Sequence, residues 1–107
     1  MKQIIVTTGS EVPGKKVVKI MGIVMGSTVR AKNFVRDIAA LMKHMLGGEV
    51  KTYTEMVNQA RDESYNRMIN QAIEMGADAI IEVDFNTAVL LSGTVETLAY
   101  GTAVKLR

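Results

Sequence analysis

Residues Thr52 to Phe85, TYTEMVNQARDESYNRMINQAIEMGADAIIEVDF, predict one long amphipathic helix that stops at a glycine and leads into a strand. Thr52 and Glu55 have the spacing of a capping box, in which each side chain bonds the other residue's free backbone N–H. Gly76 stands where a left-handed residue ends a helix. Apolar and small residues recur at steps of three and four and form one packing face: Tyr53, Val57, Ala60, Ser64, Met68, Ala72 and Met75.

The strand after this helix is expected at Ala79 to Asn86. Apolar residues alternate there with polar ones, which is typical of a strand with one buried face. The segment Thr87 to Gly93 is then expected to form an apolar hairpin tip, and Thr94 to Leu106 to form the last strand. On one side of that strand Ala99, Gly101 and Ala103 are small, which favours close contact with a helix.

The first half of the chain predicts two strands and a helix. Gln3 to Thr7 is a short strand, and Gly9 to Lys15 has nearly the spacing of a phosphate-binding loop. The residues that follow are β-branched rather than helical, so we expect a plain loop there. Lys16 to Ser27 is a long strand, with Ile20 to Met25 apolar on both faces. Because one layer of helices covers a single face, we expect a neighbouring subunit to cover the other.

A further helix is expected from Phe34 to Met45, capped by Asn33 and ending at Gly47-Gly48. The predicted order is therefore strand, strand, helix, helix, strand, strand. This order indicates a single α+β domain over residues 1–107, with a mainly antiparallel sheet and both helices on one face.

The composition excludes several classes of protein. Of the 107 residues, 48% are hydrophobic and 22% charged, which is typical of a globular domain. A net charge of +2, from dispersed basic residues, does not support a nucleic-acid surface. The chain has no cysteine, so disulfides and thiolate sites are excluded. The N-terminal apolar run is too short for a signal peptide or membrane span, and we expect a cytoplasmic protein.

An ordered set of short motifs resembles the YbjQ-type family of bacterial and archaeal proteins. The resemblance covers nearly the whole chain and implies a homopentameric ring of α+β subunits with a heavy-metal-binding role. The motifs are Gly22-Ile23-Val24-Met25-Gly26, Asn33-x-x-Arg36-Asp37, Gly47-Gly48 with Tyr53, Ala60-Arg61-Asp62, Gly76-Ala77-Asp78-Ala79, Asp84 and Gly101-Thr102-Ala103-Val104.

Five polar residues carried by these motifs are candidate ligand-binding residues near the helix starts. They either form caps and ion pairs between subunits, or hold a small anionic ligand at a subunit junction. They are Asn33, Arg36, Asp37, Tyr53 and Arg61.

Three carboxylates form a second candidate set, for a divalent metal ion. Glu82 and Asp84 are expected on one strand face, and a hairpin centred near Leu90 places Glu96 opposite Asp84. Facing carboxylates need a cation, a basic side chain from a neighbour, or water. The eight methionines offer soft thioether ligands, but at helical spacing they more often fill a core.

Two functions remain from the sequence. The first is a ring-forming binding module that holds a metal ion or small ligand at its subunit junctions. The second is an assembly or scaffold domain that recruits a protein partner through Val89 to Leu91. We expect no enzyme, because no nucleophile stands beside a base and no carboxylate pair has an evident cause for divided pKa values.

Overall fold

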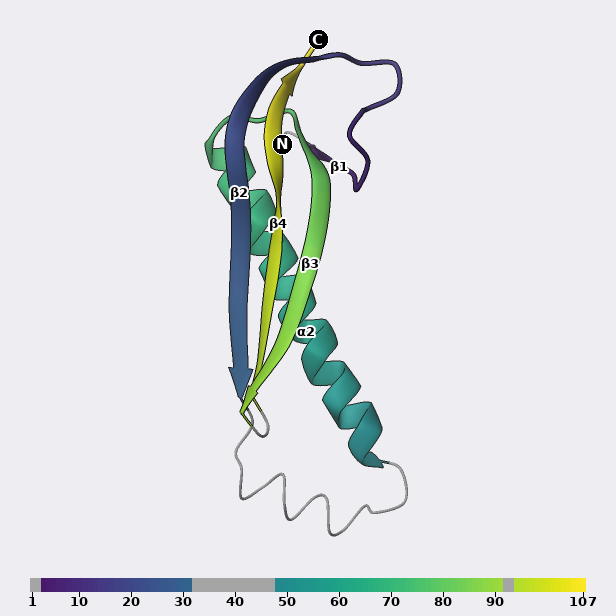
Figure 1. Cartoon of the computed structure of the whole chain (residues 1–107), viewed down its shortest axis with the longest axis vertical. Coiled ribbons are helices and arrows are strands. Elements are labelled where there is room, and N and C mark those ends of the chain that lie inside the picture. Colours follow the sequence, from purple (N-terminus) through teal and green to yellow (C-terminus); the bar gives the residue numbers. More distant parts are fainter. Residues whose placement is uncertain (1–2, 32–47, 92–93) are drawn as a thin grey trace.

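The computed structural model describes residues 3–31, 48–91 and 94–107. In this part of the chain one helix packs on a four-stranded sheet, in agreement with the predicted α+β class (Figure 1). The elements are β1 (Ile5–Val6), β2 (Val17–Ala31), α2 (Gly48–Glu74), β3 (Ala79–Leu91) and β4 (Thr94–Leu106). The helix expected from Phe34 to Met45 lies outside the described residues.

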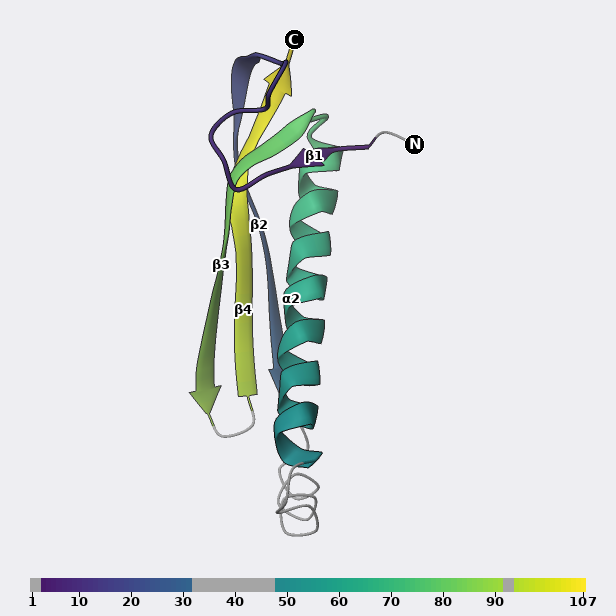
Figure 2. The same cartoon turned by 90° about the vertical axis from the view of Figure 1, so that its right-hand side faces the viewer.

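The sheet has the strand order β1-β3-β4-β2 and is mixed. β4 pairs antiparallel with both β2 and β3, as expected for a mainly antiparallel sheet. β1 pairs with β3 in the parallel direction over Ile5 and Val6. α2 covers one face of this sheet and packs chiefly over β2 and β4 (Figure 2).

The two ends of α2 give opposite outcomes for the sequence prediction. The capping box at Thr52 is wrong, because α2 already includes Gly48 and Thr52 lies inside the helix. The glycine stop is confirmed: Gly76 has φ 80°, and its N–H donates to the carbonyl of Ile73 at 3.0 Å. The N–H of Ala77 donates to the carbonyl of Ala72 at 3.0 Å, which completes a Schellman motif.

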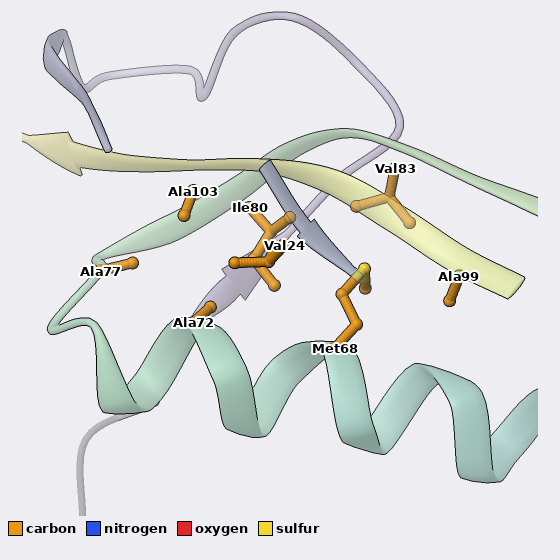
Figure 3. Packing of buried hydrophobic residues seen from close by; sticks show 8 residues of the cluster. All are labelled: Val24, Met68, Ala72, Ala77, Ile80, Val83, Ala99 and Ala103. Carbon is orange, nitrogen blue, oxygen red and sulfur yellow. The ribbon is translucent and has the colours of Figure 1, made fainter. Parts of the chain in front are cut away.

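Small residues bring α2 very close to the sheet. The buried stripe of the helix contains Met56, Ala60, Ser64, Met68 and Ala72. Met68 points from α2 toward Val24 of β2 and Ala99 of β4 (Figure 3). Opposite the helix backbone lies Gly26, where an added Cβ would stand 2.2 Å from the carbonyl oxygen of Ser64. The predicted role of small β4 residues is confirmed, since Ala99, Gly101 and Ala103 are all buried.

β3 differs from its prediction in length and in register. The strand continues to Leu91, so Thr87 to Leu91 is not a hairpin tip. An extra residue interrupts the ladder between Ile81 and Asp84, and Glu82 takes a positive φ of 52° there. This β-bulge shifts the pairing of every later β3 residue by one position relative to an uninterrupted ladder.

The N-terminal segment closes one end of the sheet. After β1 the chain forms a loop and then enters β2 without a helix, so the phosphate-loop context is absent from residues 3–31. Val12 of this loop is buried against Ala79, Ile81 and Val104. These residues alternate with those that face α2, so the loop lies on the sheet face away from the helix (Figure 2).

Candidate binding surface on the uncovered sheet face

The rest of that sheet face carries exposed apolar side chains. Val24, Gly26 and Thr28 of β2 are buried beneath α2, so the residues between them point the other way. Ile23 is 68% exposed, Met25 51% and Val29 57%. We call the side of the sheet that includes these three residues the uncovered face. The apolar side chains that the sequence places on both faces of β2 are therefore buried beneath α2 on one face and exposed on the other.

The uncovered face becomes more polar from β2 across β4 to β3. The register places Met25 beside Tyr100, and Tyr100 beside Asp84. The Tyr100 hydroxyl donates to Asp84 Oδ2 at 3.3 Å, and the Phe85 N–H donates to Asp84 Oδ1 at 2.8 Å. This row offers one carboxylate, one aromatic ring and one thioether, which suits a cation more than an anion.

The three predicted metal ligands are all exposed, but they do not gather in one subunit. Glu96 pairs with Ala88, while Asp84 pairs with Tyr100, so the predicted Asp84–Glu96 register is wrong. The reason is the longer β3, which continues to Leu91 and pairs Leu91 with Thr94. Glu96 and Tyr100 are four positions apart along β4, which corresponds to roughly 13 Å. Glu82 lies in the bulge. Within the described residues no three His, Cys, Asp or Glu side chains are grouped to hold a metal ion.

The predicted anion-binding residues are only partly described. Asn33, Arg36 and Asp37 lie outside the described residues. Tyr53 lies within α2, and Arg61 is exposed on the same helix. Arg61 belongs to α2 and Asp84 to β3, so the two residues lie in different layers of one subunit, the helix layer and the sheet (Figure 2).

Two methionines fill the core, as their helical spacing indicates. Met68 is fully buried and Met56 is 5% exposed, so neither thioether is available to a metal ion from solution. Met25 and Met75 are exposed. The chain has no cysteine thiolate, and Met56 and Met68 are buried, so the described donors of one subunit do not fit a soft heavy metal.

One charged cluster has no counterpart in the sequence prediction. Glu63 of α2 accepts from Arg30 of β2 through Oε2 and from Arg67 Nη2 through Oε1, the second contact at 2.5 Å. Arg67 also donates to the carbonyl oxygen of Ser27 at 2.5 Å. The spacing of four residues between Glu63 and Arg67 is a signal readable in the sequence. The contribution of Arg30 depends on the fold.

The fold and the uncovered face define a small α+β protein with an apolar surface on the side of the sheet that α2 does not cover. Among the described residues no helix is long and apolar enough to cross a membrane. A family model described as "Putative heavy-metal-binding" matches residues 4–107. The chain belongs to this family, the YbjQ family.

Named relatives support this assignment. A UPF0145 protein of Archaeoglobus fulgidus is 51% identical over 106 residues, 99% of this chain and 98% of the relative. A UPF0145 protein of Methanoculleus marisnigri is 53% identical over 102 residues, 95% of each chain. A crystal structure of a protein with unknown function from Pediococcus pentosaceus has a TM-score of 0.65 and 18% identity, and covers 97% of this chain and 98% of its own. At that identity the likeness concerns the fold.

Proposed function

We propose that this protein is a homopentameric, ring-forming binding module of the cytoplasm that holds a divalent metal ion or small ligand at its subunit junctions. The observation that carries the proposal is the exposure of Ile23, Met25 and Val29 on the uncovered face. Large apolar side chains exposed together on one sheet face mark an interaction site. The family label of heavy-metal binding supports a binding role rather than catalysis.

The distribution of donors supports a site shared between subunits. One described subunit gathers no three metal-ligating side chains, yet Asp84 and Tyr100 form a polar pair beside the apolar part of the uncovered face. A ring joins two different surfaces of neighbouring copies at each junction, so a second copy can complete a partial site. Glu82, Asp84 and Glu96 remain candidates for a hard cation, while Asn33, Arg36, Asp37, Tyr53 and Arg61 remain candidates for a small anion.

The ring is tested by placing a charge on the uncovered face. Ile23→Lys leaves the isolated subunit unstrained because the side chain is 68% exposed, but it puts a charge into the proposed junction. Val18→Lys is the matched control, on the same strand at 52% exposure and outside the proposed junction. Native mass spectrometry is expected to show five subunits, or a multiple of five, for wild type and Val18→Lys, and smaller species for Ile23→Lys. A wild-type monomer would refute the ring.

The ligand is tested on the assembled protein. Mg²⁺, Mn²⁺, Zn²⁺ and inorganic phosphate are added separately, and the melting temperature is followed. A cation present at a hundred times its Kd adds about 2.7 kcal/mol of stability. Asp84→Asn is expected to abolish the cation response, and Asp62→Asn, on exposed α2 surface, to leave it unchanged. An absence of any shift in the wild-type pentamer would refute ligand binding and leave the ring intact.

The alternative function is a scaffold domain that recruits a protein partner through Val89 to Leu91. The observation in its favour is that Val89 is 60% exposed near the end of β3. Leu90→Asp is then expected to preserve the ring and abolish capture of the partner.

A further inference from the structure

The outer edge of β3 is occupied only along its first part. Near the start of β3, the Ile5 N–H donates to the Asp78 carbonyl at 3.3 Å and the Thr7 N–H to the Ile80 carbonyl at 3.0 Å. At the bulge, the Glu82 N–H donates to the Gly9 carbonyl at 2.9 Å, and the Val83 N–H to the Thr7 carbonyl at 3.1 Å. The N-terminal chain then turns away onto the uncovered face.

The directions of the backbone groups beyond the bulge follow from the ladder. The Met25 N–H donates to Gln71 Oε1 of α2 at 2.7 Å, so the backbone N–H and C=O of Met25 point away from β4. The backbone groups of its neighbours Val24 and Gly26 therefore point toward β4 and bond to it. Because Gly26 pairs with Ala99, the backbone groups of Ala99 point toward β2, and those of Tyr100 point toward β3.

In the β3–β4 ladder, the same alternation points the backbone groups of Asp84, Asn86 and Ala88 toward β4. The backbone groups of Phe85, Thr87 and Val89 point toward the outer edge of β3. The bond from the Phe85 N–H to Asp84 Oδ1 agrees with this direction.

The outer edge of β3 therefore presents free backbone groups. The Phe85 carbonyl and both backbone groups of Thr87 have no partner in the described part of the chain, and neither has the Val89 N–H. Val89 is 60% exposed and Phe85 36%. α2 packs chiefly over β2 and β4. On β3, the ring of its Tyr65 stacks on the Phe85 ring from the helix face of the sheet, and residues 84–89 remain exposed along the edge.

The two edges of the sheet are protected to different degrees. On β2, Gln71 and Arg67 of α2 bond the Met25 N–H and the Ser27 carbonyl, so the edge is partly closed. From Phe85 to Gly93 the sequence FNTAVLLSG contains no charge and no proline. Proteins normally guard an exposed edge with such residues, because an unguarded edge pairs with an identical one.

We propose that the Phe85–Val89 edge pairs antiparallel with the same edge of a second copy, about a two-fold axis at Thr87. In this register Thr87 faces Thr87 of the second copy, and Phe85 faces its Val89. Both threonine pairs and aromatic–β-branched pairs are favourable across antiparallel strands. No charged residues face each other, and the two exposed apolar side chains cover one another. Because side chains of α2 partly close the β2 edge, pairing of two β3 edges is favoured over pairing of a β3 edge with a β2 edge.

This contact uses a sheet edge, whereas the proposed ring uses the uncovered face. The two associations are therefore independent, and the edge contact joins two rings face to face. All five edges of one ring then pair with those of the second ring, so the assembly closes at twice the ring and builds no fibre.

The test compares two exposed valines in the full-length chain. Val89→Lys brings two positive charges into the edge contact, and Val18→Lys is the matched control at 52% exposure. Sedimentation velocity is expected to show that Val89→Lys halves the particle mass and that Val18→Lys does not. Hydrogen exchange at Thr87 and Val89 is expected to be slow in wild type and fast in Val89→Lys.

A second variant keeps the inference testable if Val89→Lys misfolds. Thr87→Cys introduces the single thiol of a chain that has no cysteine, and a short bis-maleimide is expected to link two copies. Asp62→Cys, exposed on α2 and outside both proposed contacts, is expected to give no linked dimer.

Three results would overturn the inference. The first is an odd number of chains in the wild-type particle, and the second is fast hydrogen exchange of the Thr87 and Val89 amides in wild type. The third is a Val89→Lys protein that sediments as single subunits instead of as rings. Ile23→Lys distinguishes the two proposals, because it breaks the ring junction and leaves edge-paired dimers.

Discussion

Replacing Gly26 by alanine is expected to separate α2 from the sheet. The added Cβ would lie 2.2 Å from the Ser64 carbonyl oxygen, 2.6 Å from the Met68 nitrogen and 2.7 Å from the Arg67 Cβ. Two of these three atoms belong to helix backbone, which cannot rotate aside as a side chain can. Ordinary contact begins at 3.4 Å, so α2 must retreat by about 1 Å.

The cost follows from the size of that displacement. A gap of about 0.5–1 Å forfeits a quarter to a half of the dispersion energy between the surfaces it separates. Inserting a methyl group into a packed interior costs about 1–3 kcal/mol, and sometimes more. Loss of backbone freedom in the unfolded chain returns about 0.4–1 kcal/mol to the alanine variant. We expect a net loss of about 2 kcal/mol, which lowers the melting temperature by roughly 10 °C or more.

Urea unfolding at a fixed subunit concentration measures this loss. Gly9→Ala is the control, because its Cβ would meet nothing closer than 3.5 Å and its stability should stay within about 0.5 kcal/mol of wild type. Gly101→Ala should fall between the two, since its closest neighbour, at 2.6 Å, is Cγ2 of the Ile80 side chain and its closest backbone atom, the Ile81 carbonyl oxygen, lies at 3.1 Å. Equal urea midpoints for Gly26→Ala and Gly9→Ala would refute the close approach of α2 to β2.

Three further substitutions test local features by the same assay. Glu82→Gly should stabilise the protein by about 1 kcal/mol, because glycine takes a φ of 52° without the Cβ clash; Glu96→Gly, in regular strand, should destabilise it. Thr28→Val should stabilise by about 1 kcal/mol, because the buried Thr28 hydroxyl has no partner among the described residues; a loss of stability would indicate a bonded hydroxyl. Glu63→Gln should cost up to about 1 kcal/mol at low salt, by leaving Arg30 and Arg67 without their shared carboxylate; an effect unchanged by added salt would contradict this electrostatic account.

The sequence predicts the centre of the fold well because the relevant signals are local. The stripe through Ala60, Ser64, Met68 and Ala72 needs only helical periodicity, and the helix end at Gly76 needs only the steric freedom of glycine. The small residues of β4 were readable for the same reason, since alternation alone assigns them to one face.

The predicted Asp84–Glu96 register was wrong because it depends on nonlocal detail. No pattern marks Glu82 for a positive φ, which is uncommon for a residue with a Cβ. The end of β3 was readable in principle, because Ser92-Gly93 is a turn signal that competes with a turn near Leu90. Similarly, Thr52 and Glu55 match a capping box by spacing, but an upstream helical turn makes that cap unnecessary. The contact of Arg30 with Glu63 needs β2 and α2 to be placed side by side.

The pairing of β2 with β4 has a consequence for biosynthesis. β2 is made early, but its only strand partner in the described sheet is β4, the last of the described strands to be synthesised. While the chain is being translated, the apolar segment Val17–Ala31 has no strand partner to pair with. By contrast, α2, β3 and β4 are consecutive in the sequence and can pack together as they emerge. Nascent chains arrested before Thr94 should accordingly be clients of a holdase, and release of the finished polypeptide should end that dependence.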